Sequence, residues 1–482
     1  MSGHRASHRV GAIGLALGLL AAACGSSSSS APVLTGEPPT TRIPVVIDAD
    51  FDLSDIAAVA ILLRDPKLDV RAISIAGTGL VHCQGGRLLA RYVLDELEAS
   101  AIPFGCGREN PGKDGRSFPE EWRASADAGF GFDITPQVEA GVPLDAVEVI
   151  SAAVADSPSA PTIVTLGPLT NIEDAFAADP ELADRVAAIH AMLGTVEAPG
   201  NVLVDDHKPE DKLEWNAFAD PSAVAAVFAT EVPIAIVPLD ATDDVPVPAD
   251  LVDRLETDHA AAGADLVREL LIRNPIRLQA DQGQQLWDEL AALLLTDPDL
   301  ATWTESALTV AEDGRLVQDE AGRPARFADG ADRPAVETAL LAALQQGRPR
   351  ATPFQLAGEL SVTFDGRTCA ISGRSERDGP HRLQYRGPAG QPSGVAIIGT
   401  AEPHTWQDVL ALLPTIDLQK EPPTWLVVGP SATDEGGTGT GITTTGELAE
   451  GFYGPVCLRG NWPNLAFTAG APFEVGSGAI GS

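Results

Sequence analysis

Short β-branched runs alternate with helical patterns from Ile43 to about residue 350 of this 482-residue chain. The runs are typical of buried strands, and the segments between them carry apolar residues at the three- and four-residue spacing of one helical face. Alternation on this scale requires right-handed crossovers, so we expect an α/β fold with a mostly parallel central sheet flanked by helices. The expected strands are 44–47, 70–76, 163–166, 187–193 and 232–238, and the expected helices include 56–64, 86–100 and 170–177.

The texture of the sequence changes near residue 350, beyond which the chain is rich in Gly, Thr and Pro. Segments 359–364 and 472–475 alternate like half-buried strands, and 424–428 is a short apolar run. The stretch 436–441 is typical of a loop, and 406–413 has a helical pattern. We therefore predict an α/β domain over residues 42–350 and a small all-β, sandwich-like domain over residues 354–482.

The charge balance limits the partners of this protein. The formal net charge is −36 at pH 7, with acidic residues spread along the chain. Such a balance repels nucleic-acid phosphates and gives no electrostatic attraction to anionic lipid, which excludes nucleic acid as a partner. A small neutral or cationic molecule fits better. The oligomeric state stays open, a homo-oligomer included.

The N-terminus is typical of an exported protein. Basic residues precede an apolar run, 10–23, which is too short to span a bilayer and is typical of a signal-peptide core. Leu-Ala-Ala-Ala stands immediately before Cys24, and Gly25 and five serines follow it. This pattern resembles a bacterial lipobox, which implies a signal peptide over 1–23, lipidation of Cys24, a flexible tether over 24–41 and an extracytoplasmic location on the bacterial cell membrane. An ordinary cleaved signal with an incidental cysteine is the alternative.

Cysteine usage agrees with export. Apart from Cys24, the chain holds four cysteines, and an even number outside the cytoplasm suggests two disulfides. Position along the chain favours Cys83 with Cys106 and Cys369 with Cys457. Free buried thiols are the alternative for each pair.

Four carboxylates follow the first expected strand within eight residues, where a helix begins. They belong to Asp48, Asp50, Asp52 and Asp55. Clustered aspartates supply the oxygen ligands that a hard cation such as Ca²⁺ requires, and strand ends are where ligands bind in parallel sheets. A helix N-terminus also favours nearby negative charge, so a capping and turn cluster is the alternative.

The Asp48 to Asp55 segment resembles the Asp-x-Asp-x-x-x-Asp-Asp signature of the inosine–uridine-preferring nucleoside hydrolase family. Further matches follow in family order and cover roughly residues 42–350. They are Gly77-Thr78-Gly79, Ile102-Pro103-Phe104 with Gly105 and Gly107, Leu166-Gly167-Pro168-Leu169-Thr170-Asn171, Glu214-Trp215-Asn216 with Asp220-Pro221, and Trp287-Asp288. The chain is therefore identified as a member of that family, in the form of a bacterial lipoprotein with an added C-terminal β-domain.

The resemblance implies a calcium site. Asp50 and Asp55 match carboxylates that hold Ca²⁺, Leu166 matches the residue that coordinates the ion through its backbone carbonyl, and Asp288 matches a late carboxylate ligand. Asp48 matches the first Asp of the signature, which supports the site from behind.

The resemblance also implies a reaction, the calcium-dependent hydrolysis of ribonucleosides to free base and ribose. A metal-bound water attacks C1′ and Asp50 accepts its proton as general base. Glu214 and Asn216 match residues that bind the ribose 5′-hydroxyl, and Thr78 is a further expected substrate contact. The transition state resembles an oxocarbenium ion, which the surrounding carboxylates stabilise.

Two residues depart from the family pattern. Ser54 stands where the family has an Asp that grips the ribose hydroxyls, and a lost charge-assisted bond costs about 1.5–3 kcal/mol. Trp287 stands where purine-active members place a histidine acid, so it is expected to stack on the substrate or shape the pocket, with plain core packing as the alternative. His82 is a candidate replacement acid, with a surface histidine as the alternative. These departures keep a second hypothesis open, a catalytically weak or inactive nucleoside- or sugar-binding envelope lipoprotein.

Overall fold

The computed structural model describes residues 42–134, 144–278, 283–416, 423–434, 436–439, 441–460 and 465–480. The predicted signal peptide, Cys24 and the tether lie outside these residues, so all three stay predictions. Within the described ranges, every helix is too short or too polar to cross a membrane.

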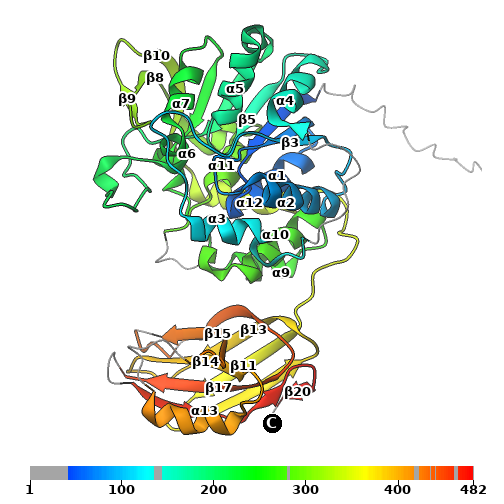
Figure 1. Cartoon of the computed structure of the whole chain (residues 1–482), viewed down its shortest axis with the longest axis vertical. Helices are drawn as coiled ribbons and strands as arrows, with labels where there is room; N and C mark the ends of the chain where they lie inside the picture. Colours follow the sequence, from blue (N-terminus) through cyan, green and yellow to red (C-terminus); the bar gives the residue numbers. More distant parts are fainter. Residues whose placement is uncertain are drawn as a thin grey trace, which may run out of the picture. The chain divides into compact units, whose positions relative to one another are not determined.

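A ten-stranded sheet forms the centre of the first domain, in the order β4-β3-β2-β1-β5-β6-β7-β10-β8-β9 (Figure 1). Neighbours from β4 to β10 pair in parallel, and only β8 and β9 add antiparallel pairs. The predicted α/β fold with a mostly parallel sheet is confirmed. The strands are β1 (Ile43–Ala49), β2 (Leu68–Ile75), β3 (Phe104–Cys106), β4 (Leu144–Asp145), β5 (Thr162–Thr165), β6 (Ala188–Met192), β7 (Ile234–Val237), β8 (Ala301–Val310), β9 (Leu316–Gln318) and β10 (Arg323–Ala331).

Helices cover both faces of this sheet because successive side chains of a strand point to opposite faces. Val45 and Ile47 of β1 belong to one buried cluster, and Val46 belongs to the other. The first cluster includes residues of α1 (Leu53–Arg64), α2 (Cys83–Glu96), α9 (Leu251–Thr257), α10 (Ala262–Arg273), α11 (Trp287–Leu294) and α12 (Arg333–Leu344). The second includes residues of α4 (Ala146–Ala155), α5 (Thr170–Ala178) and α7 (Pro221–Phe228). The remaining helices of this domain are α3 (Glu120–Asp127), α6 (Trp215–Ala219) and α8 (Leu239–Thr242).

The five predicted strands all form, within two residues at either end, and the prediction for the helix at 86–100 was shifted. Helix α2 begins earlier, at Cys83, with extended backbone at its N-cap His82. It ends earlier as well, at Glu96, because Glu98 takes a positive φ of 50°. A left-handed residue cannot continue a right-handed helix, so the apolar pattern beyond it belongs to the turn before β3.

The C-terminal region forms two antiparallel-rich sheets, β16-β13-β11-β12-β20 and β15-β14-β17-β18, with β19 paired to β17. Leu360 and Val362 of the first sheet share one buried cluster with Val395 and Ile397 of the second, so the sandwich-like prediction is confirmed. The elements are β11 (Gly358–Phe364), β12 (Cys369–Ser375), β13 (Gly379–Arg386), β14 (Ser393–Thr400), α13 (Trp406–Leu412), β15 (Leu426–Asp434), β16 (Ile442–Leu448), β17 (Phe452–Arg459), β18 (Ala466–Ala469), β19 (Phe473–Glu474) and β20 (Gly478–Ile480).

A disulfide between Cys369 of β12 and Cys457 of β17 joins the two sheets of the sandwich. The predicted pairing is therefore confirmed, and the alternative of free thiols is excluded for this pair. The 354 boundary of the sandwich domain stays a prediction.

Candidate active site

The carboxyl end of β1 turns directly into α1, and this turn gathers the acidic residues. Phe51 takes a positive φ of 53°, which is sterically costly for a residue with a side chain. Asp52 is the N-cap of α1 and accepts hydrogen bonds from the backbone N–H of Ser54 (2.6 Å) and Asp55 (2.8 Å). Asp55 in turn accepts from the N–H of Asp52 (3.2 Å). Part of the cluster is thus a capping box, as the alternative interpretation held.

Three carboxylates meet between α1 and α11. Asp52, Asp55 and Asp288 each offer one oxygen, and these oxygens lie within 4.8 Å of one another. Asp55 Oδ1 and Asp288 Oδ1 are buried without a hydrogen-bond partner. Burial, followed by the repulsion of neighbouring carboxylates, raises the pKa of Asp55 well above its ordinary value, and burial does the same for Asp288. Unpaired buried oxygens are costly, and a hard cation bound by oxygen ligands removes that cost, so this donor set fits Ca²⁺.

Asp50 lies immediately beside this group, packed under two glycine loops. Its Oδ2 accepts the N–H of Leu80 at 2.8 Å. A Cβ added to Gly79 would stand 2.1 Å from that Oδ2, so position 79 requires glycine. A Cβ added to Gly167 would stand 3.0 Å from the Asp50 Cβ, which is a tight fit. Burial raises the pKa of Asp50 to about 6, and repulsion by the Asp52 carboxylate adds to that shift. Asp50 is thus adjacent to the cation group, and its role as a ligand stays a prediction.

Asp48 lies one layer behind, inside β1. Its Oδ1 accepts from Ser74 Oγ (2.5 Å) and Asn171 Nδ2 (2.7 Å), and its Oδ2 is buried without a partner. Burial raises its pKa to about 7. Its backbone carbonyl accepts the N–H of Leu166 at 2.8 Å, which joins β1 to the loop after β5. This position agrees with support from behind the site.

Leu166, Glu214 and Asn216 are brought together at the ends of β5 and β6. Asn216 Nδ2 donates to the backbone carbonyl of Leu166 (2.8 Å), the oxygen predicted to coordinate calcium. The Glu214 carboxylate caps α6, because it accepts the N–H of Asn216 (2.9 Å) and Ala217 (3.1 Å), and it also accepts the N–H of Gly194 (2.7 Å). Burial raises the pKa of Glu214. The two predicted 5′-hydroxyl contacts therefore adjoin the predicted carbonyl ligand.

The two departures from the family pattern meet at Asp288. Ser54 is fully buried, and its hydroxyl bonds Asp288 Oδ2 and lies 3.0 Å from Asp52 Oδ1. Trp287 is the first residue of α11, directly before Asp288, and packs partly buried against the larger core cluster. Its indole N–H is buried and has no partner among the described residues. A plain core role leaves this donor unexplained, whereas a substrate contact would satisfy it.

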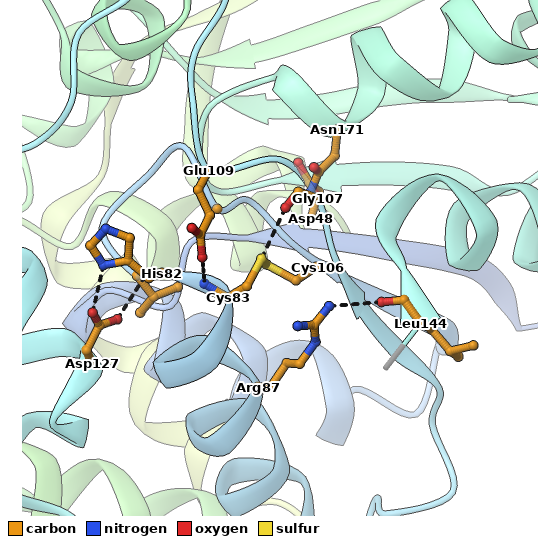
Figure 2. The surroundings of a disulfide bond; sticks show 12 residues. Asp48, His82, Cys83, Arg87, Cys106, Gly107, Glu109, Asp127, Leu144 and Asn171 are labelled. Atoms are coloured by element: carbon orange, nitrogen blue, oxygen red, sulfur yellow. Dashed lines mark hydrogen bonds and ion pairs between the residues drawn. A yellow bond between two sulfur atoms is a disulfide. The ribbon is translucent and has the colours of Figure 1, made fainter. Parts of the chain in front are cut away.

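His82 stands at the start of α2, beside the confirmed disulfide between Cys83 and Cys106 (Figure 2). Asp127 of α3 holds it twice, accepting its backbone N–H (2.8 Å) and contacting its ring Nδ1 (2.7 Å). The Cys83 N–H donates to Glu109 Oε1 (2.7 Å). The loop after β2 is therefore fixed on both sides, and the role of His82 as an acid stays a prediction.

Sequence reasoning missed several residues that hold this loop. Arg123 of α3 is buried and donates through Nη2 to the carbonyls of Gly77 (2.7 Å) and Val81 (3.1 Å). Thr78 Oγ1 lies 2.8 Å from Thr170 Oγ1, which donates to Asp220 Oδ2 at 2.9 Å. No local pattern marks these contacts, since they join residues more than forty positions apart.

Comparison with known proteins agrees with this geometry. The sequence model of the inosine-uridine preferring nucleoside hydrolases matches residues 45–339. The pyrimidine-specific ribonucleoside hydrolase RihA of Citrobacter koseri is 26% identical over 294 residues, which cover 57% of this chain and 86% of that protein. RihA of Salmonella arizonae is 27% identical over 215 residues, 42% of this chain and 61% of that protein.

Solved structures share the fold of the first domain. The inosine-uridine preferring nucleoside hydrolase from Bacillus anthracis superposes with a TM-score of 0.55 at 21% identity, covering 63% of this chain and 99% of that chain. A plant nucleoside hydrolase gives a TM-score of 0.55 at 25% identity, covering 64% and 99%. The family match ends at residue 339, before the C-terminal sandwich begins.

Proposed function

The chain belongs to the inosine-uridine preferring nucleoside hydrolase family and is a nucleoside N-glycosyl hydrolase, and we propose that it cleaves ribonucleosides to free base and ribose with Ca²⁺ as its metal and Asp50 as general base. The observation that carries the metal assignment is the meeting of Asp52, Asp55 and Asp288, with two buried oxygens left unpaired. Oxygen-only donors of full negative charge favour a hard divalent cation over a soft one.

The residues around this group divide the chemistry among them. A bound calcium ion supplies Lewis acidity that orients and acidifies the attacking water. Asp50 takes up the proton of that water. Its carboxylate accepts the Leu80 N–H and packs against Gly79 and Gly167.

The sugar and the leaving base take other residues. Glu214 and Asn216 hold the ribose 5′-hydroxyl, and Ser54 and Thr78 contact its ring hydroxyls. Trp287 offers its unpaired indole N–H or its ring face to the base. His82 protonates the departing base through Nε2, because Asp127 occupies Nδ1 and no described residue bonds the other nitrogen.

We also propose that the protein acts outside the cytoplasm, anchored to the membrane by lipid on Cys24. The small residues before Cys24 and the serine-rich stretch after it support this location. The two disulfides support it too, since such bonds persist in oxidising compartments. Metabolic labelling with a fatty-acid analogue tests it: Cys24→Ser should abolish the label and release the protein from the membrane fraction.

The first experiment measures release of ribose and free base from a panel of purine and pyrimidine ribonucleosides, with added calcium and with chelator. Asp50→Asn keeps the shape of the side chain and removes the base, so turnover should fall by at least about 100-fold. Asp69→Asn is the matched control, because Asp69 is a partly exposed β2 carboxylate whose ion-pair partners are Arg42 and Arg71. It should turn over like the wild type.

Turnover that survives thorough chelation would contradict the metal dependence. Turnover that survives Asp50→Asn would contradict the assignment of the base. Absence of turnover together with calcium-dependent stabilisation would instead support the second function, a nucleoside- or sugar-binding lipoprotein, which the departures at Ser54 and Trp287 favour.

A further inference from the structure

The disulfide between Cys83 and Cys106 joins two segments that both lead to the predicted calcium site. Cys83 is the first residue of α2 and directly follows the loop after β2. Cys106 is the last residue of β3 and directly precedes Gly107 (Figure 2). Each segment reaches an aspartate at the carboxyl end of β1, so the bond is connected to the site from both of its ends.

The path from Cys83 reaches Asp50. Leu80, three residues before Cys83, donates its backbone N–H to Asp50 Oδ2 at 2.8 Å. Gly79 lies so close to the same carboxylate that an added Cβ would stand 2.1 Å from Oδ2. A displacement of this loop therefore removes a hydrogen bond and a packing contact from the residue predicted to be both calcium ligand and general base.

The path from Cys106 reaches Asp48. A Cβ added to Gly107 would stand 1.8 Å from Asn171 Oδ1, so the backbone at Gly107 packs directly on that amide (Figure 2). Asn171 Nδ2 donates to Asp48 Oδ1 at 2.7 Å. Asp48 supports the site from one layer behind Asp50. One covalent bond thus braces the contacts of both aspartates.

Contacts other than the disulfide maintain the fold of this region. The parallel pairing of β2 with β3 extends to Cys106. Arg123 and Asp127 of α3 hold the loop after β2 by hydrogen bonds. Beside the disulfide, the Cys83 N–H donates to Glu109 Oε1, and water competes for that bond because Glu109 is exposed. Loss of the disulfide should therefore loosen the two segments locally and leave the domain folded.

The two disulfides of the protein differ in their exposure. Cys83 is partly exposed, and its partner Cys106 is 3% exposed. Cys369 and Cys457 are 4% and 0% exposed and belong to the core of the sandwich. A thiolate must reach a sulfur atom to attack it, so a dissolved dithiol should react at Cys83 and spare the bond in the sandwich.

We propose that the Cys83–Cys106 disulfide is a redox-sensitive control on the calcium site. The oxidised form holds the loop after β2 against Asp50, and reduction by a dithiol loosens that loop and weakens calcium binding. This inference rests on the proposed function, since it assumes that calcium binds at this site.

The reaction is an ordinary thiol–disulfide exchange. A thiolate of the dithiol attacks Cys83 Sγ, the bond between the two protein sulfurs breaks, and Cys106 leaves as a thiolate that takes up a proton. The second thiol of the dithiol then attacks the mixed disulfide, which releases Cys83 as a thiol and the reagent as its own disulfide. Two electrons and two protons pass from the dithiol to the protein.

The first test titrates the folded protein with calcium before and after dithiothreitol, with a calcium-sensitive dye as competitor. Loss of an outer contact to a metal ligand costs about 10- to 100-fold in affinity, so reduction should weaken calcium binding by about 10-fold. Alkylation and mass spectrometry should find Cys83 and Cys106 reduced and Cys369 and Cys457 still bridged. Circular dichroism should stay unchanged, and re-oxidation should restore the affinity.

Hydrogen exchange without calcium follows the loop itself. In the reduced protein, the backbone amides of residues 76–82 should exchange at least about tenfold faster, because the loop is no longer tied to β3 and opens more often. The central strand β5, residues 162–165, is the internal control and should keep its exchange rate.

The double variant Cys83→Ser with Cys106→Ser is the matched control for the reagent. It lacks the bond at all times, so it should bind calcium like the reduced wild type and should not respond to dithiothreitol. A response that persists in this variant would mean that the reagent acts elsewhere, which overturns the inference. Reduction of the folded wild type tests the same bond without depending on how well the variant folds.

Unchanged calcium affinity after complete reduction of Cys83 and Cys106 would overturn the inference, and so would an unchanged exchange rate in residues 76–82. Loss of the circular dichroism signal on reduction would overturn it as well, because the bond would then only keep the domain folded. An oxidised protein that binds no calcium contradicts the proposed metal instead, and the exchange rates still test the loop.

Discussion

Replacing Asp288 with asparagine should change stability in opposite directions with and without calcium. The oxygens of Asp288, Asp52 and Asp55 lie within 4.8 Å of one another. Two unit charges at that distance repel by about 3.5 kcal/mol at an effective dielectric constant of about 20. The asparagine side chain carries no charge, so the substitution removes this repulsion from two neighbours at once.

The net gain without metal is smaller than the sum of those two repulsions. Burial raises the pKa of Asp288 well above its ordinary value, so the metal-free cluster takes up protons that already relieve part of the repulsion. We expect Asp288→Asn to raise the free energy of unfolding by about 1–3 kcal/mol in chelator at slightly alkaline pH. With calcium at about 100-fold above its dissociation constant, the wild type gains about 2.7 kcal/mol and the variant, which lacks one ligand, gains less.

The assay is urea unfolding followed by circular dichroism, for each protein in chelator and in calcium. Asp69→Asn is again the control and should show the calcium gain of the wild type, because Asp69 is partly exposed and its ion-pair partners are Arg42 and Arg71. The reasoning is refuted if Asp288→Asn loses the same stability in both conditions. Asp288 would then act only as the partner of the Ser54 hydroxyl.

Buried charges lead to three further predictions. Burial lowers the pKa of His190 from 6.5 to about 4, so the unfolded chain takes up a proton that the folded chain refuses. The contribution of His190 to stability should therefore fall by about 3 kcal/mol as pH drops from about 6.5 to 4, and the difference between wild type and His190→Gln in urea unfolding measures it. Arg350→Met removes one cation from the buried carboxylates Asp265 and Glu269, which keep Arg268 and Arg273 as partners. It should cost about 1.5–3 kcal/mol, measured by thermal melting. Ser54→Asp restores a charged contact to the ribose and should raise kcat/KM about 10- to 100-fold at saturating calcium.

The sequence was sufficient for those parts of the site that the sheet itself brings together. Asp50 follows β1 and Leu166 follows β5, and these strands pair in parallel. The carboxyl ends of parallel strands share one edge of the sheet, so the spacing of two strand patterns placed these residues side by side without any knowledge of their rotamers. Both disulfide pairings were predictable for a similar reason, because few cysteines leave few combinations.

Contacts made by side chains across loops were not predictable in this way. The resemblance assigned no role to Asp52, yet Asp52 both caps α1 and joins the cation group, since its position depends on the left-handed turn at Phe51. Asp127 reaches His82 from forty-five residues away, on a helix that carries no motif. Such contacts depend on how two elements pack, and hydrophobic periodicity gives the face that a helix buries without giving the partner of each polar side chain.

The carboxylates that this site already carries disfavour a further carboxylate at position 54, where the chain has a serine. Asp52, Asp55 and Asp288 lie within 4.8 Å of one another, and Ser54 is fully buried in contact with one of them. A further carboxylate at position 54 would add repulsion of about 3.5 kcal/mol for each ionised neighbour at such a distance, at an effective dielectric constant of about 20, whenever the metal is absent. Serine avoids that cost and still bonds Asp288 through its hydroxyl.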